Sequence, residues 1–214
     1  MSRGEPIYTF IHIPKCGGSC VEKYFETHYS DRIVGTTHKW LCEKDNNPIV
    51  IIRDPIDRFI SLYHYWKNGS HGRNSRGTEF TEKYGNCSIK DFINMFKLNT
   101  DAIKNNYMHE LVSGYMWRVH YFPQVYWIHR DCFENAIVIK YTENLDEKIH
   151  TLLDYLHIPD KHIELEKSNI TRKKDGEQAV LDEEDIVWLR EHFREDFELW
   201  NAVDETPARF KYVL

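Results

Sequence analysis

The sequence lacks the features that are typical of membrane-spanning, secreted or nucleic-acid-binding proteins. No apolar run approaches the roughly 20 residues that a helix needs to cross a membrane, and the first residues, MSRGEP, lack the apolar stretch of a secretory signal. The net charge is −6, from 28 Lys and Arg against 34 Asp and Glu, whereas a general nucleic-acid binder is usually basic overall. We therefore expect an intracellular chain that does not bind nucleic acid, with a trimmed luminal domain as the alternative.

Cysteine is scarce, and its spacing is not that of a structural zinc site or a disulfide framework. The five cysteines are Cys16, Cys20, Cys42, Cys87 and Cys132. Their number is odd and no two form a C-x-x-C pair, so neither kind of site is indicated and reduced thiols are expected. The sequence also shows no cluster of metal-ligating residues, no internal repeat and no low-complexity tract.

The residues that are present suit a globular domain of the α/β class. The chain has 214 residues, of which 41% are hydrophobic and 29% charged, as in ordinary globular proteins. Near-continuous apolar stretches predict buried strands at 7–13, 33–35, 48–52 and 135–141. Because these strands alternate with helical patterns, we predict a three-layer α/β/α fold with a central parallel sheet.

Helices are predicted from apolar spacing and from residues that start helices. Residues 19–29 have apolar side chains at helical spacing. Asp54 followed by Pro55 predicts the start of a second helix, and Asn144 with Glu147 three residues later predicts a capping box.

The end of the chain has the pattern of a helix, whereas part of its middle has no regular pattern. The last helix is predicted to begin in the acidic run 182–185 and to continue as one element through Trp200. Residues 67–86 lose all periodicity and read as a long polar loop, which is usually functional or mobile. We predict a single domain over residues 1–214, with a loop and helical insertion at about 67–127.

The stretch IYTFIHIPKCGGSC, residues 7–20, predicts a P-loop-like phosphate-binding loop. Backbone N–H groups of Gly17, Gly18, Ser19 and Cys20 would converge where the strand turns into a helix, and the helix dipole favours an anion there. Lys15 stands ahead of the glycines, whereas the G-x-x-x-x-G-K-[ST] loop of triphosphate-binding proteins has its lysine after them. Taken alone, the pattern fits a plain strand–helix turn equally well.

A second candidate phosphate-binding element follows the strand at 48–52. Arg53 ends that strand, and Ser61 lies eight positions on, two turns along the next helix. Both side chains could reach one further phosphate from the far side of the first loop. The alternative is that Arg53 pairs with Asp57 and that Ser61 is a packing residue. This alternative is less well supported, because the two candidate phosphate-binding elements occur in order on adjacent strand–helix units.

The two elements together resemble a known family. HIPKCGGS followed by IIRDPIDRFIS is similar to the sulfotransferases that use 3′-phosphoadenosine-5′-phosphosulfate (PAPS), and is most like the carbohydrate sulfotransferases of the Golgi and their bacterial and viral relatives. The later segments HYFPQ, IKYTENL and REDFELW resemble further family segments in the same order. The resemblance therefore spans nearly the whole chain, and its first two segments are the specific ones.

The resemblance implies which residues bind the donor. The 5′-phosphosulfate would be held by Lys15, Cys16, Gly17, Gly18, Ser19 and Cys20. Arg53 and Ser61 would hold the 3′-phosphate, and Arg172 lies where family members close a loop over the nucleotide. Because a lysine ahead of the glycines can meet the oxygen that bridges phosphate and sulfuryl group, Lys15 is also a catalytic candidate. PAPS would be the co-substrate and adenosine 3′,5′-bisphosphate the product, with no metal required.

Sulfuryl transfer to an alcohol needs a base for the hydroxyl proton, and histidine titrates in the right range for that role. Of the twelve histidines, His38 in GTTHKW lies between the two phosphate motifs and resembles the Gly-His segment of the carbohydrate branch. We predict that His38 is the base, with Glu22 and Glu26 as carboxylate alternatives. Structural or surface roles are expected for His12, His28 and His64.

The acceptor would be a carbohydrate hydroxyl, with a protein tyrosine or a small alcohol left open, and the insertion is its predicted binding face. Aromatic rings on which a sugar could stack are Trp66, Tyr115, Trp117, His120, Tyr121 and Trp127. Basic side chains that could meet an acidic saccharide are Lys67, Arg73, Arg76 and Lys83. For any single one of these residues, core packing or a solvated surface is the stronger expectation.

Two other functions stay open. One is a nucleotide-binding protein of the same fold without the chemistry, against which the intact Lys15, Arg53, Ser61 and His38 argue. The other is a P-loop-like small-molecule kinase, against which the missing G-K-[ST] order and the lack of a clear magnesium carboxylate argue. The expected location is the cytoplasm, with the Golgi lumen as the alternative.

Overall fold

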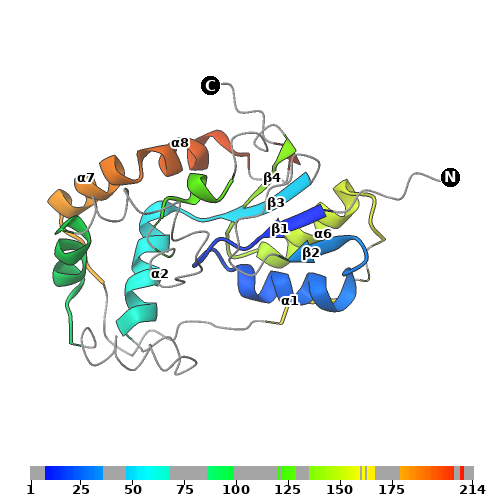
Figure 1. The fold of residues 1–214 in the computed structure, drawn as a ribbon, viewed down its shortest axis with the longest axis horizontal. Helices are drawn as coiled ribbons and strands as arrows, with labels where there is room; N and C mark the ends of the chain where they lie inside the picture. The colour runs from blue at the N-terminus through cyan, green and yellow to red at the C-terminus, as the bar shows by residue number, and fades with distance from the viewer. Residues whose placement is uncertain are drawn as a thin grey trace.

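The computed structural model of the chain describes residues 8–35, 47–67, 86–98, 120, 122–128, 135–159, 161, 163–166, 179–204 and 208–209. A five-stranded sheet lies at its centre (Figure 1), and its strands are β1 (Tyr8–Ile11), β2 (Ile33–Gly35), β3 (Asn47–Ile52), β4 (Ile137–Lys140) and β5 (Ala208–Arg209). The order across the sheet is β2-β1-β3-β4-β5. Strands β1 to β4 are parallel, as predicted, whereas β5, which was not predicted, pairs antiparallel with β4.

The central strands are made of β-branched residues. Residues 49–52 of β3 and 137–139 of β4 are all isoleucine or valine, and every one of them is buried. Such side chains suit a pleated surface, and an unbroken apolar run suits a strand that is covered on both faces. This is why the strands could be located from the sequence.

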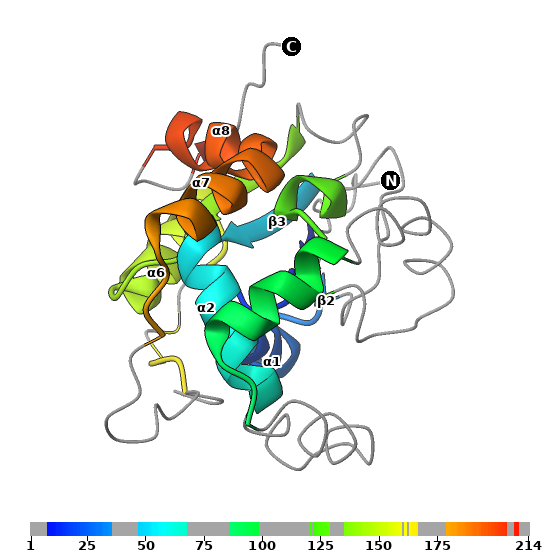
Figure 2. The ribbon, with the colours of Figure 1, turned by 90° about the vertical axis from the view of Figure 1, so that its left-hand side faces the viewer.

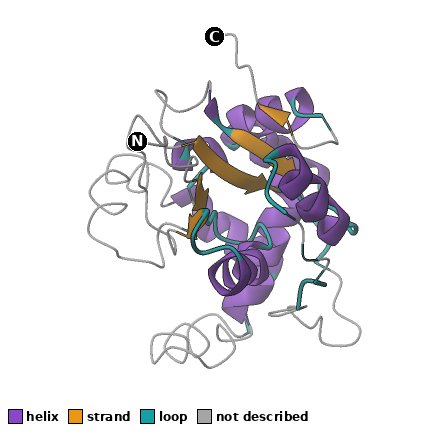
Figure 3. Ribbon diagram, turned by 90° about the vertical axis from the view of Figure 1, so that its right-hand side faces the viewer, coloured by secondary structure: helices purple, strands orange, loops and turns teal. Residues whose placement is uncertain are grey.

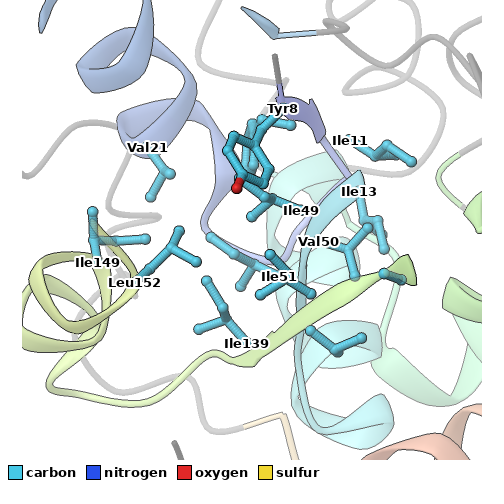
Figure 4. Close-up of a cluster of buried hydrophobic side chains, with 14 of the residues drawn as sticks. Tyr8, Ile11, Ile13, Val21, Ile49, Val50, Ile51, Ile139, Ile149 and Leu152 are labelled. Carbon is cyan, nitrogen blue, oxygen red and sulfur yellow. The ribbon is translucent and has the colours of Figure 1, made fainter. Parts of the chain in front are cut away.

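Helices lie on both sides of the strands (Figure 3). On one face of the sheet lie α1 (Gly18–His28) and α6 (Leu145–Tyr155). Val21 of α1 and Ile149 of α6 point toward Ile51 of β3, and all three belong to one buried cluster (Figure 4).

The opposite face is covered by the short 3-10 helix η2 (Gln124–Trp127) and by α8 (Arg194–Ala202), which lie across the sheet from α1 (Figures 1 and 2). Trp127 and Leu199, both fully buried, join the same hydrophobic cluster from this side. Helices on both faces of a mainly parallel sheet confirm the predicted three-layer α/β/α fold.

A second buried cluster lies beyond the carboxyl edge of the sheet. There α2 (Pro55–Lys67), the helical residues 89–98 and α7 (Glu183–His192) lie side by side (Figure 2). Its buried residues are Phe59, Leu62, Tyr63, Trp66, Ile89, Phe92, Ile93, Phe96, Leu189 and Phe193. This cluster holds α2 against its neighbours, and α2 in turn faces the candidate phosphate-binding loop described below.

The predicted start of α2 is confirmed, but the predicted capping box of α6 is wrong. Asp54 Oδ1 accepts hydrogen bonds from the backbone N–H groups of residues 56 and 57, at 2.9 and 3.0 Å. At α6, Asn144 precedes the helix but its side chain caps no backbone N–H. Its amide oxygen accepts instead from the Thr142 hydroxyl at 2.5 Å, and its Nδ2 donates to Glu147 at 3.1 Å.

The last predicted helix is two helices rather than one. The backbone of Phe193, with φ −102° and ψ 29°, separates α7 from α8. The ring of Phe193 is buried in the second cluster, whereas Leu199 of α8 is buried in the first. The helix is therefore interrupted at Phe193, and the buried apolar residues before and after the break belong to different hydrophobic clusters.

Much of the predicted insertion at about 67–127 lies outside the described residues, so the division into one domain with an insertion stays a prediction. Within the described ranges, residues 89–98 of this region are helical. None of the helices in these ranges is both long enough and apolar enough to cross a membrane.

Candidate active site

The two predicted phosphate-binding elements meet at one edge of the sheet. β1 lies between β2 and β3, so the chain moves to one side of β1 in its first crossover and to the other side later. Open α/β sheets bind ligands outside the carboxyl ends of their strands at such a switch point. The first loop follows β1 and Arg53 follows β3, and both therefore lie at this position.

The glycines of the first loop are required by the side chains that surround them. Gly17 has a φ of 78°, in the left-handed region that favours glycine. A Cβ on Gly17 would overlap the ring of Tyr141, and one on Gly18 would overlap the ring of His12. In the described structure, α1 has no side-chain cap and no acidic residue in its first turn. Its first N–H groups therefore suit an anion.

Lys15 lies between this loop and α2. Its φ is 68°, and its Nζ lies 4.1 Å from the centroid of the Tyr65 ring on α2. The Tyr65 ring in turn stacks on His120, with centroids 5.6 Å apart. Burial, together with the neighbouring positive charge of Arg53, lowers the pKa of Lys15 to about 8. The ammonium group is thus held in a partly dehydrated site, where an anion would stabilise it.

Arg53 reaches toward the same loop from the end of β3. Its Nη1 donates to the carbonyl oxygen of Lys15 at 3.4 Å, and its guanidinium lies 4.8 Å from the centroid of the Tyr141 ring. Its Nε is buried and has no hydrogen-bond partner among the described residues. A buried N–H without a partner is costly, so this side chain has donor capacity that a bound anion would use.

Ser61 lies on the face of α2 that is turned to the loop. It stands three residues after Arg58 and four before Tyr65, and residues at these spacings share one face of a helix. Arg58 Nε donates to the Pro14 carbonyl at 3.0 Å, and Tyr65 contacts Lys15. The helix therefore places Ser61 between two residues that touch the loop.

Not every residue of the first motif faces outward. Cys16 is fully buried, and its thiol donates to Gln124 Oε1 at 3.1 Å. Burial raises the pKa of this thiol to about 11, so it stays protonated and able to donate. Ser19 is exposed at the start of α1, and the half-buried Cys20 donates its thiol to the Gly17 carbonyl at 3.1 Å. The side chain of Cys16 thus anchors the loop to the protein interior. The resemblance had implied only that Cys16 helps to bind the donor.

The predicted base and the predicted loop over the nucleotide, His38 and Arg172, lie outside the described residues. The carboxylate alternatives are described. Glu22 is buried and accepts from His12 Nδ1 at 2.7 Å, whereas Glu26 is exposed. His12 is buried, as predicted for a structural histidine.

The described part of the predicted sugar platform is buried. Trp127 is 0% exposed and belongs to the first hydrophobic cluster, and Trp66 is 5% exposed and belongs to the second. His120 is buried between aromatic rings. The stacking role considered for Trp66 and Trp127 is therefore wrong, and core packing explains both. The candidates Tyr115, Trp117, Tyr121, Arg73, Arg76 and Lys83 lie outside the described residues.

Three buried polar residues that the sequence did not single out connect the site. Arg58 donates to the carbonyls of Pro14, Phe122 and His120, at 3.0, 2.9 and 3.2 Å. Asp196 accepts hydrogen bonds from Gln124, and Gln124 in turn bonds Cys16 and Arg53. Burial raises the pKa of Asp196, and the charge of Arg58 opposes that rise.

These residues stand in segments whose order along the chain resembled the family, RDPIDRFIS, HYFPQ and REDFELW. Only the presence of an ionisable or amide group in each segment could have drawn attention to them. Their burial depends on contacts with residues far away in the sequence. The hydrogen bonds of Arg58 span 44 to 64 residues and those of Gln124 span 71 to 108, and no local pattern records such contacts.

Comparison with known proteins agrees with this arrangement. A family model described as "Sulfotransferase family" matches residues 8–201. The chain belongs to this family. The match runs from β1 into α8, so it includes both candidate phosphate-binding motifs and the buried residues that connect them. No curated protein and no solved structure matches the chain.

Membership of this family supports transfer of a sulfuryl group to an acceptor as the class of reaction. The reaction in this family generally uses PAPS as donor. Within the described ranges, no three or more His, Cys, Asp and Glu side chains are grouped so as to hold a metal ion.

Proposed function

We propose that this sulfotransferase moves the sulfuryl group of PAPS to a hydroxyl of a carbohydrate, with His38 as general base. The observation that carries the proposal is the meeting of Lys15 and Arg53 at the switch point, with the buried Nε of Arg53 lacking a hydrogen-bond partner in the described part of the chain. Two cationic side chains on adjacent strand–helix units suit a nucleotide that carries phosphate at two positions.

In this proposal the first loop and α1 hold the 5′-phosphosulfate, and Arg53 and Ser61 hold the 3′-phosphate. The acceptor oxygen bonds to sulfur as the bond between sulfur and the bridging oxygen of the donor breaks. His38 takes the hydroxyl proton, and Lys15 stabilises the negative charge that develops on the bridging oxygen. The products are the sulfated acceptor and adenosine 3′,5′-bisphosphate. Arg172 would close over the bound nucleotide.

Calorimetry with adenosine 3′,5′-bisphosphate and with ATP–Mg²⁺ tests this proposal. We expect the bisphosphate to bind without metal and more tightly than ATP–Mg²⁺, because the site offers two separate cationic contacts and a loop without the triphosphate motif. Transfer of radiolabelled sulfate from PAPS to a panel of glycans should follow. Binding without any transfer to glycans, tyrosine peptides or small alcohols would indicate an inactive relative. Preference for ATP–Mg²⁺ would indicate a kinase.

Replacing Arg53 with alanine should weaken the bisphosphate by about 10- to 150-fold, and AMP, which lacks the 3′-phosphate, by far less. The reason is a charge-assisted contact worth about 1.5–3 kcal/mol that only the 3′-phosphate makes. Titration calorimetry of both nucleotides measures the difference. Arg190→Ala, which removes an exposed arginine from α7, is the control and should change neither affinity. Equal losses for both nucleotides in Arg53→Ala would make Arg53 a structural residue.

A further inference from the structure

The side chain of Gln124 joins the two phosphate-binding elements. It is 1% exposed and stands at the first position of η2. Its Oε1 accepts from the backbone N–H of Arg53 at 2.7 Å and from the thiol of Cys16 at 3.1 Å, while its Nε2 donates to the carbonyl of Arg53 at 2.9 Å. One amide therefore bonds both backbone groups of Arg53 and the loop that carries Lys15.

Gln124 is itself held by a buried carboxylate. Asp196 of α8 accepts from the backbone N–H groups of Gln124 and Val125, at 2.8 and 3.0 Å. The same carboxylate accepts from Gln124 Nε2 at 3.4 Å. Since an amide side chain has two acceptor lone pairs and two donor hydrogens, these contacts use all of its capacity. The orientation of the amide is thus set from both sides.

This arrangement matters because the two elements belong to different strand–helix units. The first loop leaves β1 and Arg53 leaves β3, and the sheet fixes the strands but not the segments beyond their ends. We infer that Gln124 is a positioning residue that holds the loop and Arg53 at the separation spanned by the two phosphates of a single nucleotide. The inference rests on the proposed function. Its hydrogen bonds go to the protein, so this role requires no contact between Gln124 and the nucleotide.

Such a residue has a specific thermodynamic signature. A ligand with both phosphates gains from the second contact only if the two sites are held at the matching distance, whereas a ligand with one phosphate does not depend on that distance. Loss of Gln124 should therefore reduce the advantage of the bisphosphate over AMP and over 3′-AMP. A merely structural residue would change all three affinities alike.

The test measures the dissociation constants of adenosine 3′,5′-bisphosphate, AMP and 3′-AMP for the full chain and its variants. In Gln124→Met, which keeps the length of the side chain, we expect the preference for the bisphosphate to fall about tenfold or more, the equivalent of one or two lost hydrogen bonds. Each monophosphate should change less than about threefold. An unchanged preference in a folded Gln124→Met protein would overturn the inference.

A second pair of variants serves if Gln124→Met does not fold. Cys16→Ala removes the thiol that bonds Gln124, together with its packing in the first hydrophobic cluster, and should also lower the preference. Cys16→Ser keeps a donor there and should lie closer to the wild type. Equal preferences in these two variants would count against the inference.

Asp185→Asn is the matched control. Asp185 is also 1% exposed, but it bonds Lys90 and Lys97 at 2.9 and 3.1 Å, away from both phosphate motifs. This variant should melt at a lower temperature and keep the wild-type preference for the bisphosphate over the monophosphates. A lowered preference in this variant would mean that the ratio of affinities reports general destabilisation, and it would overturn the inference. If the wild type shows no preference for the bisphosphate at all, the donor assignment fails first, and this inference fails with it.

Discussion

Replacing His38 with alanine is expected to leave the binding of PAPS and adenosine 3′,5′-bisphosphate intact and to reduce turnover by about 10²- to 10⁴-fold, the usual contribution of a general base. β2 is parallel to β1 and adjacent to it, and it ends at Gly35. Because parallel strands have their carboxyl ends at the same edge, the chain that leads from Gly35 to His38 starts beside the phosphate-binding loop. Single-turnover kinetics with PAPS, together with calorimetry, separates chemistry from binding.

The pH dependence of the reaction checks the same assignment. In the wild type, kcat/KM should fall on the acid side as the imidazole of the free enzyme becomes protonated, and that limb should vanish in His38→Ala. The ordinary pKa of histidine, near 6.5, locates the limb only broadly. Near-normal turnover in His38→Ala, with activity abolished in Glu26→Gln or Glu22→Gln, would identify a carboxylate as the base. Glu26→Gln is the cleaner variant, because Glu22 also bonds His12.

Lys15→Ala is expected to lower turnover by about 10²- to 10³-fold, comparable with the loss of one group that stabilises a developing negative charge. Its effect on PAPS affinity should be smaller, because the charge on the bridging oxygen is largest in the transition state. The measurement is kcat against the dissociation constant of PAPS. Lys23→Ala, which removes an exposed lysine from α1 that bonds Glu166, should change neither quantity. A raised KM with normal turnover in Lys15→Ala would contradict a catalytic role.

Lys15 should also produce an alkaline limb in the pH profile. Burial, with the positive charge of Arg53, lowers the pKa of Lys15 to about 8. As the pH rises through that value the ammonium group loses its proton and its positive charge, so kcat/KM for PAPS should fall above about pH 8. The limb should be absent in Lys15→Ala and should move to higher pH in Arg53→Ala. Persistence of the limb in Lys15→Ala would assign it to another group.

Local features of the sequence were enough to predict the four parallel strands and the start of α2. The apolar run at 49–52 and the Asp54-Pro55 start of α2 depend on side chains within a few residues of each other. The same holds for the loop, because a lysine and two glycines between a strand and a helix already imply its shape. These predictions succeeded because hydrophobic periodicity, the preference of β-branched residues for strands and helix capping all depend on residues close together in the sequence.

What needed the tertiary structure was the set of contacts between distant segments. Trp127 looked like a possible platform for a sugar and is a core residue, because its neighbours come from strands and helices far along the chain. The apolar residues before and after Phe193 have the spacing of one continuous helix, but the buried ones belong to two different hydrophobic clusters. Gln124 and Asp196 have no local partner that marks them as part of the site. By itself the sequence determined the four parallel strands, and the two motifs and their order. The fold decided how the motifs are held together, because hydrogen bonds across 71 residues leave no periodic trace.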